Sequence, residues 1–173
     1  MKTSRLAVLS GAFLAMTLGA CGGENPAPPG AEPEGDRFEL RLKGVDAEQY
    51  QKVMLGVGQV EVTANGRPVT VRLAPAGRTM DLTSKDQAYL LGYFYLPHEA
   101  TTAQVRVLFD DVGAYQATDS AGLIRARSAA IQFTSKRLDL EKRKRVVVQL
   151  HLKDSLFQSN GSKVLLPSTF IVH

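Results

Sequence analysis

The most reactive side chains of this sequence are a single cysteine, Cys21, and three histidines, His98, His151 and His173. None of the histidines stands at a metal-ligand spacing from another ligand residue, so the sequence predicts no metal site. The serines occur without a Gly-x-Ser-x-Gly elbow, and the chain has no glycine-rich phosphate loop. Nucleophilic and phosphoryl-transfer chemistry therefore lack support, and we predict neither catalytic residues nor a cofactor.

Cys21 closes a short apolar segment at the start of the chain. Lys2 and Arg5 precede about thirteen apolar or small residues, which is the layout of a secretory signal. A helix that spans a bilayer needs about twenty apolar residues, so a transmembrane anchor is not expected. Ala20 suits an ordinary signal-peptidase site, but Leu18 does not. We expect residues 1–20 to be a signal peptide, with cleavage between Ala20 and Cys21.

The residues Leu18-Gly19-Ala20-Cys21 resemble the bacterial lipobox. This resemblance implies a diacylglycerol on the Cys21 sulfur, cleavage before Cys21, and acylation of the new amino terminus. Several acyl chains give stable membrane attachment. The alternative is a secreted soluble protein with a free thiol. Because Gly22 rather than Asp follows the cysteine, similarity to enterobacterial lipoproteins predicts the outer membrane.

Composition is that of an exported globular domain: 173 residues, of which 44% are hydrophobic and 22% charged. Without residues 1–20, nineteen basic and seventeen acidic side chains remain, so the mature chain is nearly neutral and nucleic-acid binding is not indicated. Residues 21–36 begin with Cys21, and the stretch from Gly22 to Asp36 contains no large apolar residue. We expect this stretch to be a tether of up to about 45 Å, followed by one domain over residues 37–173.

Strand patterns fill that domain. Phe38, Leu40 and Leu42 alternate with charged residues and predict a half-buried strand, which a turn follows near Asp46. A strand over residues 53–63 is predicted with a bulge at Gly58. The sequence Asn65-Gly66 predicts a type I′ hairpin, and Pro68 predicts an edge strand. Further strands are predicted over residues 69–73, 88–96, 103–109, 123–127, 129–134, 138–140, 146–152 and 164–172.

These elements predict an all-β protein with an antiparallel β-sandwich. The order Val60-Glu61-Val62, Met80-Asp81-Leu82, Gln104-Val105-Arg106-Val107 and Val148 to Ser155 resembles a bacterial and archaeal lipoprotein family, the domain of unknown function 4382 family. The resemblance extends over residues 44–172 and implies a prealbumin-like or immunoglobulin-like sandwich. It transfers no catalytic residue, because the family has no established activity.

A pair of tyrosines is one candidate contact with a ligand or partner. In a strand, Tyr93 and Tyr95 share one face while Phe94 and Leu96 share the other. Phe94 and Leu96 have no polar atoms and should enter the core, so we expect both tyrosines to face water. Such a platform suits a sugar ring or an envelope protein. The alternative is a cross-strand aromatic pair that only stabilises the sheet.

Two charged segments are further candidates. Lys142, Arg143, Lys144 and Arg145 stand between Leu140 and Val146, where a hairpin turn is expected. They form either a solvated turn or a contact with anionic lipid headgroups. The second segment comprises Asp110 and Asp111, with Asp119 beyond, which are either calcium ligands or turn residues.

The sequence thus favours a lipid-tethered, non-catalytic binding or structural module of the cell envelope. The membrane, through acylated Cys21, is the predicted partner, together with an envelope protein or a glycan. The alternative is an envelope hydrolase whose catalytic residues meet only in the folded chain.

Overall fold

A computed structural model describes residues 33–173 of the chain. The predicted cleavage site between Ala20 and Cys21, and the tether up to Glu32, lie outside the described residues. Pro33–His173 forms one compact unit. Within it, no helix has the length and apolar character that crossing a membrane requires.

The strand β1 (Asp36–Val45) lies at the centre of a five-stranded sheet. Phe38, Leu40 and Leu42 are buried, which confirms the alternation that predicts this strand. β1 pairs antiparallel with β7 (Tyr89–Leu96) and parallel with β12 (Arg145–His151). The outer strands are β5 (Val71–Leu73) beside β7 and β15 (Thr169–Val172) beside β12.

A four-stranded sheet contains β11 (Ala130–Lys136), β8 (Thr102–Phe109), β3 (Val57–Ala64) and β4 (Arg67–Pro68), in that order. The register of β3 shifts between Val57 and Gln59, so the bulge predicted at Gly58 is confirmed. Asn65 and Gly66 both have positive φ, at 51° and 76°, and join β3 to β4 as predicted. β4 is the last strand of this sheet, which confirms the edge position of Pro68.

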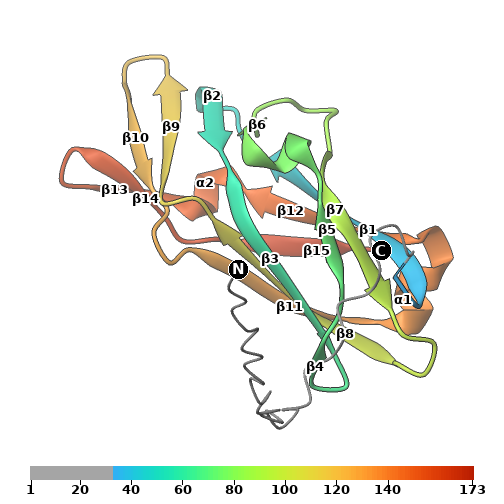
Figure 1. Ribbon diagram of the computed structural model, residues 1–173. Helices are drawn as coiled ribbons and strands as arrows, with labels where there is room; N and C mark the ends of the chain where they lie inside the picture. The colour runs from blue at the N-terminus through green and yellow to red at the C-terminus, as the bar shows by residue number, and fades with distance from the viewer. Residues whose placement is uncertain (1–32) are drawn as a thin grey trace, which may run out of the picture. The chain divides into compact units, whose positions relative to one another are not determined.

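The six-stranded sheet has the order β13-β14-β10-β9-β2-β6. Gly56 alone separates β2 (Tyr50–Leu55) from β3, and only two residues separate β8 from β9 (Val112–Ala117), so two paths run from one sheet into the other (Figure 1). The remaining strands are β6 (Met80–Asp81), β10 (Ala121–Arg125), β13 (Leu156–Ser159) and β14 (Ser162–Leu165).

Between the strands, residues 33–173 contain three short helices: η1 (Pro75–Arg78), α1 (Arg137–Arg143) and α2 (Leu152–Ser155). The strand predicted over residues 138–140 is wrong, because α1 occupies this position. Leu138 and Leu140 fit an alternating pattern, but only Leu140 is buried. The structure also contains β9, which the sequence pattern does not predict because Asp110, Asp111 and Gly113 indicate the end of a strand.

One hydrophobic core joins residues of all three sheets, including Phe38 and Phe94, whose rings stack with centroids 5.5 Å apart. The mostly β class is confirmed. A purely antiparallel arrangement is wrong, since β1 pairs parallel with β12 and β10 pairs parallel with β14. The parallel pairing of β1 with β12 determines which side chains meet where these two strands end, at Val45 and His151.

Candidate functional site

The parallel pair β1–β12 brings two distant parts of the chain together. Val45, the last residue of β1, is opposite His151, the last residue of β12. Because parallel strands end at the same edge of a sheet, the residue that follows β1 must lie beside His151. That residue is Asp46, which has a left-handed backbone with φ of 53°.

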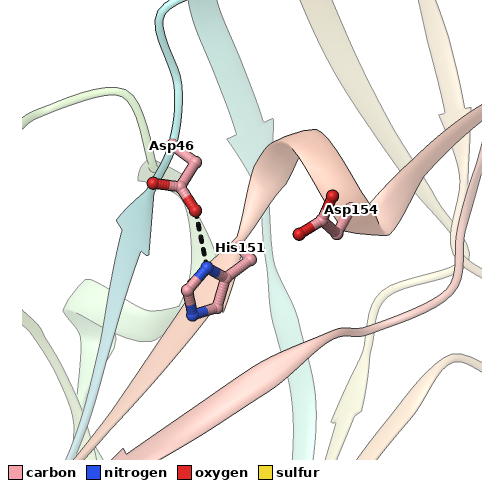
Figure 2. Close-up of side chains that lie close together, drawn as sticks. All are labelled: Asp46, His151 and Asp154. Carbon is pink, nitrogen blue, oxygen red and sulfur yellow. Dashed lines mark hydrogen bonds and ion pairs between the residues drawn. The ribbon is translucent and has the colours of Figure 1, made fainter.

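Asp46 and His151 form a close polar pair. An Oδ2 atom of Asp46 lies 2.6 Å from Nδ1 of His151 (Figure 2). The His151 side chain is 31% exposed and that of Asp46 is 47% exposed, so solvent reaches both partners.

Asp154 completes a cluster of three ligand-bearing side chains. Helix α2 begins directly after His151, and residues three apart on a helical turn lie on the same side. Asp154 therefore lies on the same side of the turn as His151. One ligand atom from each of Asp46, His151 and Asp154 lies within 4.8 Å of the others (Figure 2). The cluster offers one imidazole nitrogen and two carboxylates, a set that can hold a divalent cation.

Sequence spacing alone does not find this cluster. Asp46 lies 105 residues before His151, and the two meet only because β1 and β12 are parallel neighbours. The one local signal is the pair His151 and Asp154, three residues apart at the end of a predicted strand. The prediction of no metal site considered each histidine without these folded neighbours.

A serine–histidine pair lies elsewhere, between Ser135 at the end of β11 and His173. The Ser135 Oγ and His173 Nε2 atoms are 2.8 Å apart. Ser135 has 0% exposed surface, so its hydroxyl cannot reach a substrate in this conformation. The nearby Asp139 instead accepts a hydrogen bond from Lys142 at 2.7 Å. This pair therefore gives the hydrolase alternative no accessible nucleophile.

The two tyrosines of the predicted platform are less exposed than expected. Phe94 and Leu96 enter the core as expected. Tyr95, however, is only 9% exposed, and Tyr93 is half-buried. The guanidinium of Arg37 lies 5.0 Å from the centre of the Tyr93 ring, and that of Arg72 lies 5.5 Å from the centre of the Tyr95 ring. Arginines of the neighbouring strands β1 and β5 cover the surface on which a sugar ring was expected to stack.

The four basic residues Lys142, Arg143, Lys144 and Arg145 are all exposed. They lie at the end of α1 and the start of β12, not in the predicted hairpin turn. Lys144 ends the helix with φ of 52°. Leu138, on the same helix, is 74% exposed. This end of the domain thus combines dense positive charge with one protruding apolar side chain.

Asp36 connects this basic end to the start of β1. Its carboxylate forms an ion pair with Arg137 of α1 and lies 3.8 Å from Nζ of Lys144 and 3.3 Å from Nδ1 of His98. Partial burial acts to raise the pKa of Asp36. The positive charges of Lys144 and Arg137 and the hydrogen bond from His98 outweigh it, so the pKa lies below its ordinary value.

The acidic residues considered as calcium ligands do not converge. Asp110 and Asp111 lie between β8 and β9, whereas Asp119 lies beyond the far end of β9. A strand of six residues spans about 20 Å, so Asp119 is remote from the other two. Asp111 instead approaches Arg127, with 3.6 Å between Oδ2 and Nε.

A cavity of about 580 Å³ lies between β3, β5, β7 and η1. Arg78 and Asp110 supply charged groups to its lining, and the half-exposed Leu73 supplies an apolar one. No local sequence pattern predicts this cavity, because its walls come from segments up to about fifty residues apart. It can receive a side chain or small group of a partner.

Comparison with known proteins finds no match for this chain. No protein-family model matches it, and neither the curated proteins nor the solved structures contain a match.

Proposed function

We propose that this chain is a lipid-anchored cell-envelope protein that acts as a non-catalytic binding or structural module, with the α1 end of its domain turned toward an anionic membrane surface. The lipid is attached at Cys21, and the outer membrane is the proposed location because Gly22 follows the cysteine. The domain is a β-sandwich of prealbumin-like or immunoglobulin-like type, and the resemblance to the domain of unknown function 4382 family supports this assignment through the quoted motifs alone.

The position of the basic segment relative to the predicted tether carries this proposal. β1 begins at Asp36, the last residue of the tether, and Asp36 contacts both Arg137 and Lys144. A lipid on Cys21 therefore holds the basic end of the domain within about 45 Å of the bilayer, the full extension of the tether. Residues 136–145 contain six basic and two acidic side chains. This charge complements the phosphates of anionic lipids.

The magnitude of the attraction supports docking. Each basic residue close to an anionic leaflet contributes about 1 kcal/mol. Within the described residues, Arg143 and Arg145 form no ion pair, whereas Lys142 and Lys144 each approach one aspartate. Two to four effective charges therefore give roughly 2–4 kcal/mol at low salt. The lipid supplies the anchoring, and this smaller term orients the domain.

Site-specific fluorescence tests the orientation. The full-length protein carries Leu138→Cys with a fluorophore and is reconstituted into vesicles that contain a lipid-borne quencher. We expect strong quenching in vesicles rich in phosphatidylglycerol, reduced by 0.5 M salt and absent in purely zwitterionic vesicles. The unsubstituted protein should take up no thiol label, because Cys21 is acylated.

Asn160→Cys is the matched control. Asn160 is exposed in the turn between β13 and β14, which lies far from α1 in the domain (Figure 1). A label there should show little quenching in either vesicle. Equal quenching at positions 138 and 160, or quenching that salt does not change, contradicts the proposed orientation.

A further inference from the structure

The Asp46, His151 and Asp154 cluster differs from the other polar groups of the domain in its charge balance. Asp36, for comparison, faces Arg137, Lys144 and His98. Among the described residues, the Asp46 side chain forms an ion pair and a hydrogen bond with His151 alone, and Asp154 forms no ion pair or side-chain hydrogen bond. Two carboxylates thus converge on one imidazole without an arginine or lysine partner. A bound cation would supply the missing positive charge.

We propose that Asp46, His151 and Asp154 form a binding site for a divalent transition-metal ion of the zinc type. Imidazole nitrogen and carboxylate oxygen are both ligands of Zn²⁺ in proteins. Calcium and magnesium instead take oxygen ligands alone, so the nitrogen of His151 favours the zinc class over them. This inference is independent of membrane anchoring and of any partner in the envelope.

The geometry requires only a small local adjustment. Ligand atoms about 2.0–2.1 Å from a tetrahedral ion stand roughly 3.3 Å from one another. The 2.6 Å separation between Asp46 and His151 must therefore lengthen slightly, as the metal replaces the proton between them. The widest separation within the cluster, up to 4.8 Å, must shorten. Asp46 and Asp154 are both exposed, so their side chains are free to make these movements.

Three protein ligands leave one position of a tetrahedral ion open. Structural zinc sites are usually closed by four protein ligands, whereas an open position holds water or a group from another molecule. Here the ion would join the end of β1 to the end of β12 and the first turn of α2. It would stabilise this edge of the sheet and present one exchangeable position to solvent or to a partner.

Zinc titration of the detergent-solubilised full-length protein tests this site. After treatment with a chelator, calorimetry with Zn²⁺ should show one ion per chain. Loss of groups that only support a metal ligand weakens metal binding about 10–100-fold, so Asp154→Asn and His151→Gln should each weaken it at least tenfold. Binding of equal strength in Asp154→Asn and in the unsubstituted protein overturns the proposal.

His98→Gln is the matched control, because His98 also approaches an aspartate but lies among basic residues. We expect its zinc binding to be unchanged. A spectroscopic readout avoids dependence on variants: in protein with ¹⁵N-labelled histidine, Zn²⁺ should shift the Nδ1 resonance of His151 and leave that of His98 in place. A His151 resonance that does not respond to Zn²⁺ also overturns the proposal.

Discussion

Asp36 is the residue whose charge ties the start of the domain to helix α1. Arg137 reaches it with a side chain that is mostly buried, and the same guanidinium donates hydrogen bonds to the carbonyl oxygens of Pro97 and Ala100 at 2.7 and 3.2 Å. One arginine thereby connects β1, α1 and the loop between β7 and β8. Loss of the Asp36 charge would leave Arg137 without its carboxylate partner.

We therefore expect Asp36→Asn to lower the free energy of unfolding by about 1–2 kcal/mol at neutral pH. The pKa of Asp36 is lowered in the folded state, so its contribution is complete above the unfolded value of about 3.9 and is lost as the pH falls through the folded pKa. Urea unfolding between pH 2 and pH 7 measures this effect.

Asp119→Asn, in an exposed turn, is the control for this experiment and should change little at any pH. The difference in stability between Asp36→Asn and the unsubstituted protein should shrink as the pH falls below about 4, because the carboxyl of Asp36 is then protonated first in the unfolded chain and, at lower pH, in the folded chain. A difference that stays constant down to pH 2 would show that the charge of Asp36 is not responsible.

Gly56 marks the bend where β2 passes into β3. A Cβ atom at this position would collide with the carboxylate of Asp110 and with the carbonyl oxygen of Arg78. We expect Gly56→Ala to destabilise the domain by about 1–3 kcal/mol, the usual cost of overpacking. Gly66→Asn is the control, because the space around Gly66 is open and asparagine tolerates its positive φ. Thermal unfolding of both variants checks this, and equal melting temperatures would refute it.

Helix α1 replaces a predicted strand, and its two leucines test this assignment. Leu140 has 0% exposed surface and Leu138 has 74%. Leu140→Ala should cost about 2–5 kcal/mol, while Leu138→Ala should stay within about 0.5 kcal/mol. Chemical denaturation measures both. Similar losses in the two variants would mean that both leucines are packed and that the helix is wrongly placed.

Alternation predicted most of the strands because each needs only a local pattern. β1, β8 and β12 have buried residues at every second position over much of their length, and the Asn65-Gly66 turn needs only two residues. Pairing direction has no comparable local signal. The parallel contact between β1 and β12 depends on segments about a hundred residues apart, and so does the meeting of Asp46 with His151.

Local sequence patterns also do not predict how far side chains on the outer face of a sheet are buried by neighbouring strands. Tyr93 and Tyr95 were placed correctly on the face opposite Phe94, but Arg37 and Arg72 from neighbouring strands cover them. Only the strand order of the five-stranded sheet shows that these arginines flank β7. By contrast, the exposure of Lys142 to Arg145 follows from their charge, whether they lie in a turn or a helix.

For the whole protein, the membrane in which it resides can be tested independently of the lipid anchor on Cys21. If Gly22 directs sorting as proposed, the acylated protein should collect with outer-membrane markers in a density gradient of cell membranes. Gly22→Asp should move it toward inner-membrane fractions in a host that follows the enterobacterial rule. An unsubstituted protein found with inner-membrane markers would contradict the proposed location while leaving the lipid anchor intact.

Mass spectrometry of the amino-terminal fragment tests the lipid anchor most directly. Protein isolated from the membranes of a bacterial host is digested, and the fragment that contains Cys21 is measured. We predict a chain that begins at Cys21, with a diacylglycerol on its sulfur and an acyl group on its amino terminus, and we predict that Cys21→Ser removes this species. A mature chain with an unmodified Cys21 thiol, or one that begins at another residue, would contradict the account.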